Sequence, residues 1–268
     1  MPKKKDPSVT FLNRFGYNVV KLPRFGIEPM DIIGRDETTQ WLGPLASVWK
    51  SSEAVPVPSP PRAAAPINGQ KTDQLQVTFG LRILANALSA FGATVPQLDA
   101  SYSRARKVQF AYSNVTSTVV PPLEAGNYLA AGTLNTANPV VTHYFKDEDT
   151  QAFLIVDVLK SDTITVSATD EHGAEVAVDV PAIQSLVGAK VAVKPSGSST
   201  STLAFTGQQP ITFGFIVDEI EYDGTRWSLR GAAPSGALAF SAGASGQAGS
   251  GVLAEAPILL GTGCRIRV

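Results

Sequence analysis

The sequence predicts a β-rich protein in which strands and hairpins outnumber short helices. Val, Thr, Ser, Ala and Gly dominate the middle of the 268-residue chain, a composition that favours strands and turns over long helices. Several segments alternate apolar and polar side chains with a period of two, as half-buried strands do. Proline-rich and glycine-rich stretches separate these segments. A chain of this length can bury a core as one large domain or two small ones.

The charge and the few metal-binding side chains exclude several classes of function. The formal net charge is -1, so nothing global indicates a nucleic-acid partner. Cys264 is the sole cysteine, which excludes an internal disulfide and a cysteine metal cluster. The two histidines, His143 and His172, leave little room for a histidine metal site. We therefore expect no metal and no cofactor.

The sequence also indicates a cytoplasmic protein. No apolar run reaches the ~18 residues of a membrane helix, and the N-terminus lacks the apolar core of a secretory signal. The basic residues up to Arg35 outnumber the acidic ones. Such a cluster is either a solvated face or a contact with anionic lipid, which is worth ~1 kcal/mol per basic side chain near a charged membrane.

Residues 11–50 form a short module of their own. Tyr17 to Leu22 predicts a strand ended by Pro23, and residues 31–33 predict a second strand. The apolar residues that follow fall at helical or near-helical spacing, with Pro44 placed for a first turn. This predicted helix contains Trp41, Leu42, Leu45, Val48 and Trp49.

Residues 54–66 predict a surface loop between this module and the main sheet. The segment AVPVPSPPRAAAP carries five prolines in thirteen positions and has no periodicity. Proline at this density prevents both a helix and a strand ladder.

The segment from Leu75 to Gly92 satisfies two periods at once. Its odd positions are apolar from Leu75 to Ala87, which is the pattern of a strand. Leu81, Leu84, Leu88 and Phe91 also lie at the spacing of an amphipathic helix. The segment is either simply ambiguous, or helical in a soluble state and extended in a membrane.

The residues after this segment predict its hairpin partner. Alternation resumes at Leu98–Tyr102 and again at Val108–Tyr112, with residues 92–97 as the tip. A second hairpin is predicted from residues 163–169 and 175–180, joined by the turn 170–173. It follows a wholly apolar strand, residues 152–156.

The last part of the body predicts a short helix and three more strands. Residues 181–188 favour a helix, and Val191 and Val193 a strand. A loop at residues 196–201 leads to a long strand, 211–222, which a turn at 223–224 joins to a partner strand at 225–230.

The chain ends in an uncharged linker and an apolar peptide. Residues 231–251 are small and of low complexity. A free apolar peptide promotes aggregation, so we expect it to dock on the same molecule, either as a releasable latch or as a C-terminal strand that completes the sheet. Cutting the tether lowers its effective concentration from about millimolar to micromolar, worth ~4 kcal/mol. The residues that would dock are Val252, Leu253, Ile258, Leu259, Leu260 and Ile266.

Two strings in the N-terminal module resemble the opening of bacterial gasdermins. They are FGYNVVKLPR at residues 15–24 and LGPLA at residues 42–46. The resemblance also takes in the proline-rich loop, the hairpin region 73–112 and the short terminal peptide. It implies an α+β fold like the gasdermin N-terminal domain: a twisted, mainly antiparallel central sheet with peripheral helices.

The resemblance implies a function that is not enzymatic. Residues 1–230 would be a pore-forming body, 231–251 a cleavable linker and 252–268 an autoinhibitory peptide. A protease, caspase-like or other, would remove the peptide. The body would then leave the cytoplasm, assemble into a large homo-oligomer and insert hairpins into the lipids of the bacterial inner membrane, killing the cell in antiphage defence.

Several residues are assigned to this mechanism. The membrane-inserting hairpins would contain Leu75, Val77, Phe79, Leu81, Ile83, Val108, Phe110, Ile164, Val166, Val176 and Val178. Lipid headgroups would contact Lys3, Lys4, Lys5, Arg14 and Arg24. Members of the family often carry a lipidated cysteine near the N-terminus, which is absent here because Cys264 lies in the tail. The three lysines are expected to serve instead.

The linker contains no Asp, Lys or Arg, so a protease specific for those residues finds no target inside it. Leu238 and Phe240 are its largest side chains and are therefore the candidate residues before the cut. Arg230, at the edge of the linker, is the next candidate.

The sequence gives little support to an enzyme. It contains no G-x-S-x-G, P-loop, H-E-x-x-H or dinucleotide glycine fingerprint, so no catalytic residue is assigned. His143 lies near three acids, which fits a solvated turn. The alternative function is that of a structural β-rich protein, a phage or surface assembly component without membrane activity.

Overall fold

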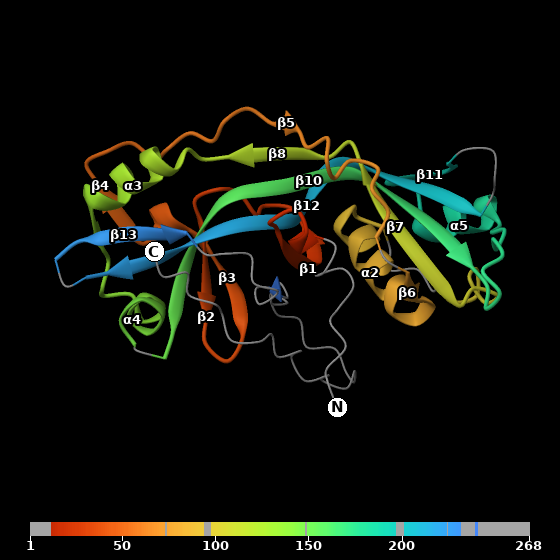
Figure 1. Ribbon diagram of the computed structural model, residues 1–268, viewed down its shortest axis with the longest axis horizontal. Coiled ribbons are helices and arrows are strands. Elements are labelled where there is room, and N and C mark those ends of the chain that lie inside the picture. Colours follow the sequence, from red (N-terminus) through yellow and green to blue (C-terminus); the bar gives the residue numbers. More distant parts are fainter. Residues whose placement is uncertain are drawn as a thin grey trace.

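A computed structural model describes residues 12–72, 74–93, 98–147, 149–196, 201–223, 225–231 and 239–240 (Figure 1). Its centre is one curved sheet whose longest strands are β10 (Gln151–Thr169) and β12 (Thr202–Tyr222). These two strands pair antiparallel along most of their length, with register shifts between residues 155 and 163. The predicted class, a mainly antiparallel sheet with peripheral helices, is confirmed.

One half of the sheet curls back on itself. The strands follow the order β14-β1-β12-β10-β2-β3, in which β1 is Asn18–Arg24, β2 is Asp31–Arg35 and β3 is Thr39–Pro44. The last strand, β14 (Ala239–Phe240), pairs with β1 in parallel and also lies against β3. The two ends of this path therefore meet at β14.

Shorter strands extend the sheet on both sides of its centre. The strands on β10 are β7 (Lys107–Ser113) and β8 (Thr116–Val119), followed outward by β6 (Leu75–Gln76) and β5 (Arg62–Ala63). The strands on β12 are β11 (Val191–Pro195) and β13 (Trp227–Gly231). A separate pair joins β4 (Trp49–Ser51) to β9 (Gly132–Leu134).

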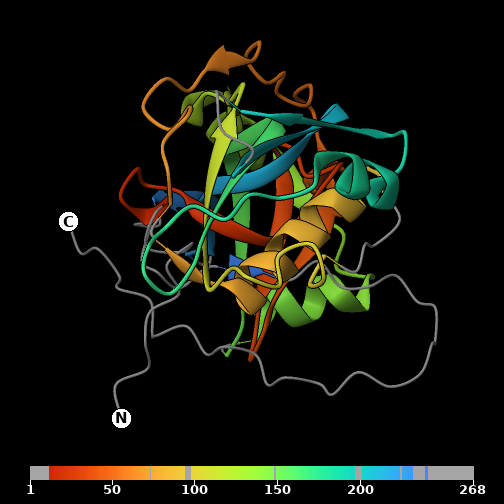
Figure 2. The same ribbon diagram turned by 90° about the vertical axis from the view of Figure 1, so that its right-hand side faces the viewer.

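Four α-helices of the described residues lie around the sheet. They are α2 (Val77–Ala90), α3 (Pro122–Ala130), α4 (Pro139–Lys146) and α5 (Val180–Val187). The side chains of Asn138 and Asp179 cap α4 and α5 by accepting backbone N–H groups of the first turn. Figure 2 looks onto the end of the molecule where α2 and α5 lie.

The core has two main parts, one at each end of the long strands. At one end Leu84 and Leu88 of α2 pack with Val166 and Phe205 of the sheet. At the other end Trp49, Tyr128 and Leu154 belong to a second cluster. A third cluster, with Ile33, Phe153 and Phe215, lies within the curled half.

The helix predicted at Trp41–Trp49 is wrong. The segment forms β3, one 3₁₀ turn (Leu45–Ser47) and β4. The indole N–H of Trp41 donates to Asp31 at 2.8 Å, while Leu45 and Trp49 are buried in a different cluster. The near-helical spacing arose because consecutive short elements each bury one or two residues.

The predicted pairing of residues 163–169 with residues 175–180 is also wrong. The turn at residues 170–173 forms, but beyond it only Thr169 and Glu175 make a bridge. The outer part of β10 pairs instead with β7 on one side and β12 on the other. Residues 176–179 belong to no strand, although Val176 and Val178 are buried in the core.

Other predicted elements match with changed limits. The first strand runs through Pro23 to Arg24, with an irregular register that tolerates the proline. Residues 98–104 form turns rather than a strand, and the ambiguous segment is a strand only at Leu75–Gln76 and a helix from Val77. The predicted strands at 31–33, 152–156, 191–193, 211–222 and 225–230 and the helix at 181–188 are confirmed.

Candidate functional site

The residues predicted to enter a membrane form one buried core in this structure. Their described side chains belong to a single cluster or pack directly against it, although they come from four separate parts of the chain. The side chain of Phe79 lies outside the described set. The others are Leu75, Val77, Leu81, Ile83, Val108, Phe110, Ile164, Val166, Val176 and Val178.

Helix α2 lies unusually close to strand β7 because residue 80 is glycine. A Cβ atom on Gly80 would lie 1.9 Å from Cγ2 of Val108, which is far inside van der Waals contact. Glycine in a helix interior costs about 0.5–1 kcal/mol relative to alanine. Glycine at position 80 therefore weakens helix α2 slightly, but it allows the helix backbone to lie close to β7.

Two residues of the predicted linker are part of the sheet. Strand β14 pairs Ala239 with Val19 and Phe240 with Val20. Strand β1 in turn lies beside α2, the helix that carries the first set of predicted membrane residues. These two linker residues and helix α2 thus both contact strand β1.

The other candidates for the cut and for the docked peptide fall in different places. Leu238 and the peptide residues Val252 to Ile266 lie outside the described residues. Arg230 is on β13, where its Nη1 donates to Glu221 at 2.9 Å. This candidate is therefore held in a paired strand, which a protease must first unfold.

Of the basic residues assigned to lipid, Arg14 and Arg24 are the two that the structure describes. Lys3, Lys4 and Lys5 lie outside the described residues, and Arg14 is exposed. The guanidinium carbon of Arg24 lies 4.4 Å from the centroid of the Trp41 ring, which links β1 to β3 by a cation–π contact.

A buried carboxylate ties the N-terminal module to the centre of the sheet. Tyr17 donates its hydroxyl to Oδ2 of Asp157 at 2.6 Å, and Ser117 donates to Oδ1 at 2.8 Å. Asp157 is 7% exposed, and burial raises the pKa of its carboxyl group above the ordinary value because an ionised group is poorly solvated there. Burial and the neighbouring carboxylate also raise the pKa of Tyr17.

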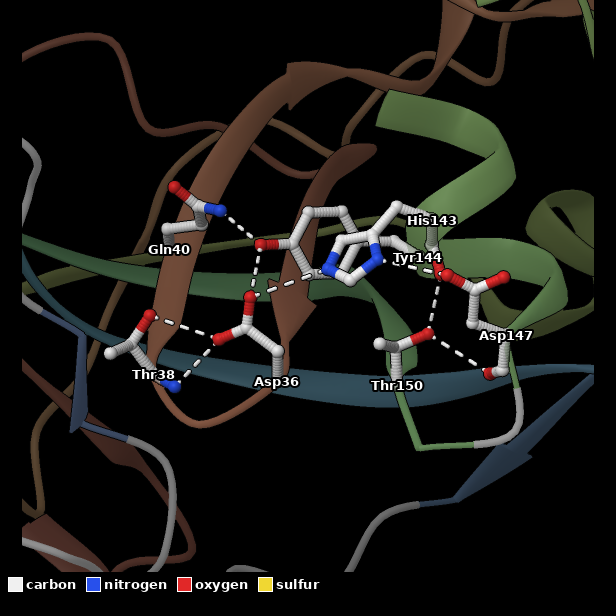
Figure 3. A network of polar contacts seen from close by, with 7 residues as sticks. All are labelled: Asp36, Thr38, Gln40, His143, Tyr144, Asp147 and Thr150. Carbon is white, nitrogen blue, oxygen red and sulfur yellow. Dashed lines mark hydrogen bonds and ion pairs between the residues drawn. The ribbon is translucent and has the colours of Figure 1, made fainter. Parts of the chain in front are cut away.

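A second polar network joins the β2–β3 turn to helix α4 (Figure 3). Asp36, in the turn, accepts hydrogen bonds from the Thr38 backbone at 2.7 Å and from the Tyr144 hydroxyl at 2.9 Å. His143 lies 3.0 Å from Asp147 through Nδ1 and 3.5 Å from Asp36 through Nε2. Gln40 donates to the Tyr144 hydroxyl.

The His143 side chain is exposed and serves as a link between the two acids. The hydrogen bond to Asp147 raises the pKa of its imidazole, and the contact with Asp36 adds to this. The hydrogen bond from the Thr38 backbone lowers the pKa of Asp36, which keeps that carboxylate ionised. This arrangement fits a charge-assisted brace, because the two ring nitrogens of His143 face the carboxylates of Asp147 and Asp36.

We expect the stabilisation from this brace to depend on pH. Because the folded pKa of His143 is raised, its contribution is complete below the unfolded pKa and is lost as pH rises through the folded pKa. The Tm of His143→Gln should fall below that of the parent at about pH 5.5 and approach it at about pH 8.5. Thermal unfolding of both proteins at the two pH values measures this; equal Tm differences at both would contradict it.

Neither polar network was identified from the sequence. The sequence does contain one signal for the first network, because Asp157 is the single acid in the apolar run AFLIVDVL. Its partner Tyr17 is 140 residues away in the chain, so the contact itself was not readable. The solvated turn predicted at His143 is wrong: the residue lies on α4 and faces the β2–β3 turn.

Within the described residues, no group of three or more His, Cys, Asp and Glu side chains is placed to hold a metal ion. None of the helices in the described part of the chain is long and apolar enough to span a bilayer.

Comparisons with known proteins agree with the fold and the sequence strings. The model of the Bacterial Gasdermin Family matches residues 20–231. A gasdermin bGSDM from Vitiosangium sp. is 38% identical over 243 residues, which cover 90% of each chain. One from Lysobacter enzymogenes is 31% identical over 232 residues, covering 85% of this chain and 84% of the relative.

A solved structure shows the same fold. The structure of a bacterial gasdermin from Bradyrhizobium tropiciagri matches with a TM-score of 0.61 at 19% identity. The match covers 85% of this chain and 91% of the other. The family match over most of the chain and the relatives above 30% identity lead to one conclusion: this chain belongs to the bacterial gasdermin family, whose members are pore-forming cell-death proteins and not enzymes.

Proposed function

We propose that the intact chain is self-inhibited and that proteolysis within residues 231–251 activates it. Loss of the terminal peptide, residues 252–268, releases the body, residues 1–230, to assemble and insert β-hairpins into the bacterial inner membrane. The resulting pores kill the cell as a defence against phage. The observation that carries this proposal is the pairing of β14 with β1, the strand that lies beside α2.

The short β14 pairing suits a releasable latch. It joins two residues of the linker region to Val19 and Val20, so few hydrogen bonds hold it. Tethering supplies a local concentration of about millimolar, and cutting the tether removes ~4 kcal/mol of that advantage at micromolar protein. A latch that the tether keeps closed can thus be opened by a single cut.

The position of β14 ranks the candidate cut sites. A cut after Leu238 places both β14 residues on the released peptide, whereas a cut after Phe240 leaves them on the body. A cut after Arg230 must occur inside β13. We therefore place the cut after Leu238 ahead of Phe240 and Arg230, with a caspase-like or other protease as the activating partner.

The buried core described above supplies the membrane-inserting surface. A tilted membrane strand needs about 9–11 residues, and a closed barrel leaves no unpaired backbone in lipid. Helix α2, with 14 residues, is long enough for such a strand, and both β7 and the outer part of β10 carry apolar residues at alternate positions. The intact monomer stays in the cytoplasm, and Lys3, Lys4, Lys5, Arg14 and Arg24 contact lipid headgroups once it is cut.

Dye release from anionic liposomes tests the proposal. We would replace residues 232–238 with the recognition sequence of a specific protease and compare cut with uncut protein. We expect leakage only after cutting, because only then does β14 leave β1. The parent protein treated with the same protease is the control. Complete cutting without leakage would contradict the proposal and favour the structural, assembly-forming alternative.

A further inference from the structure

At the end of the molecule where α2 and α5 lie (Figure 2), the sheet has one edge at β7 and another at β11. The edge at β7 is covered by main chain: β6 pairs with it, and Thr72 and Gly69 donate their backbone N–H groups to Phe110 and Tyr112. Strand β11 pairs with β12 on one side, and no strand of the described residues pairs with its other side. An unpaired strand edge can pair with another chain, and proteins therefore protect such edges.

The side chain of Gln184 occupies the outer edge of β11. Its Nε2 donates to the carbonyl of Val191 at 2.9 Å, and its Oε1 accepts the backbone N–H of Val193 at 2.8 Å. A single residue of a parallel neighbouring strand would make the same two hydrogen bonds, one on each side of Ala192. The side-chain amide thus takes the place of a strand at this edge.

The short connection between α5 and β11 holds the amide in this place. Helix α5 ends at Val187, and Gly188 follows with a φ of +77°, a conformation that glycine adopts without strain. Nε2 of Gln184 also donates to the carbonyl of Gly188 at 2.9 Å. Ile183 and Val187 are buried in the core, so the helix is anchored by apolar side chains while Gln184 reaches the strand edge.

A proline adds to the protection of this edge. Alternate residues of an antiparallel strand direct their backbone groups to opposite sides. Because Val191 and Val193 face Gln184, Pro195 faces the same outer edge, where it offers no N–H. Proline and exposed lysine, here Lys194, are residues that hinder pairing at edge strands.

We propose that Gln184 blocks the edge of β11 against a second copy of this chain and so keeps the uncut protein monomeric. The inference goes beyond the proposed function, because it concerns the uncut protein in solution and involves neither a membrane nor a protease. Its test is therefore independent of dye release. Without the amide, the outward backbone groups of Val191 and Val193 would be left for another strand to pair with.

The geometry of the edge favours a second copy as the chain that would pair there. In a two-fold dimer the same edge meets itself, so the two β11 strands run antiparallel. Val193 directs both its N–H and its C=O outward, so it can exchange two hydrogen bonds with Val193 of the second copy. Ala192, which is small and exposed, then lies opposite Lys194 of the second copy, and the two Lys194 side chains do not face each other directly.

Gln184→Met tests the block, because it removes the hydrogen bonds of the amide with little change in side-chain length. The uncut full chain is studied by sedimentation over a range of concentrations, in reducing buffer that prevents linkage through Cys264. We expect the parent to be a monomer and the variant to form a dimer with a dissociation constant lower by about tenfold or more. Ser185→Met, which places the same side chain at an exposed position of α5, is the matched control and should stay monomeric.

A charge at position 192 tests which edge pairs, and in which register. In the Gln184→Met background, Ala192→Lys places two lysines directly opposite each other and should weaken the dimer, whereas Ala192→Glu places a carboxylate opposite Lys194 and should strengthen it. Where circular dichroism shows that Gln184→Met does not fold, Gln184→Glu replaces it and is judged by the same results. Glutamate keeps an acceptor for Val193 but cannot donate to Val191.

Three results would overturn the proposal. The first is a folded variant at position 184 that stays monomeric at every concentration. The second is a dimer whose affinity is the same with lysine and with glutamate at position 192. The third is a Ser185→Met protein that dimerises as strongly as Gln184→Met, since association would then reflect the added apolar side chain and not the opened edge.

Discussion

Gly80→Ala is expected to lower the free energy of unfolding by about 2–3 kcal/mol, the cost of overpacking a tight core. The new methyl group would lie 1.9 Å from Cγ2 of Val108, with Phe110 also within contact range. Valine has little freedom to turn aside because its χ1 is restricted. Helix α2 must therefore move off the sheet, which weakens the cluster that holds the predicted membrane residues.

Gly126→Ala is the matched control for this change. Gly126 lies in helix α3, and no atom outside its own helix lies within 4 Å of a Cβ built there. Alanine should stabilise that helix by about 0.4–1 kcal/mol. Chemical denaturation of both variants measures the opposite signs expected from the same substitution.

A double variant separates the steric clash from other effects. Val108→Ala removes the methyl group that Gly80→Ala would meet, so the two changes together should cost about 1–2 kcal/mol less than their sum. We also expect cut Gly80→Ala protein to release dye faster than the cut parent, because α2 is already loosened. Additive stabilities, or a Gly80→Ala variant as stable as the parent, would contradict the close contact between α2 and β7.

Tyr17→Phe is expected to destabilise the protein by about 2–3 kcal/mol at neutral pH, as loss of a hydrogen bond to a buried charged group does. The hydroxyl of Tyr17 donates to Asp157 at 2.6 Å, and the phenylalanine leaves that oxygen without this donor. In an Asp157→Asn background the same change should cost less, because the acceptor is no longer ionised. Urea unfolding of the four proteins gives the coupling free energy between the two residues.

The pH dependence of Asp157 follows from the direction of its pKa. Because its folded pKa is raised, the folded state keeps this proton at pH values where the unfolded state has lost it. The contribution of Asp157 to stability therefore falls as pH rises from the ordinary carboxyl pKa to the raised one, and it is constant above the raised pKa. Asp157→Asn should lack this component, and an unchanged pH profile in that variant would contradict the assignment.

The strands of the body were readable because their evidence is local. In β10, the run from Ala152 to Val156 is wholly apolar, and Ile164, Val166 and Ala168 alternate with polar residues. Pro181, at the second position of α5, likewise indicated locally where that helix begins. The fold class and the apolar residues of the candidate site followed from such patterns and from the two sequence strings.

Pairing and register were not readable because they depend on distant parts of the chain. The alternation at residues 175–180 predicted a partner for β10, yet β7 and β12 occupy both of its edges. The spacing of Trp41, Leu45 and Trp49 fitted a helix because sequence periodicity does not show that these side chains are buried in different clusters.

The sequence by itself determined a β-rich chain with alternating hairpin segments, an apolar tail and a segment at residues 75–92 that fits two periods. Only the tertiary structure decided that this segment is a helix. Burial of Leu84 and Leu88 against the sheet requires the helical spacing, and Gly80 allows the close approach. The tertiary structure also brought Tyr17 to Asp157 and β14 to β1. Local patterns state which side chains need burial, whereas the partners that bury them are chosen by long-range packing.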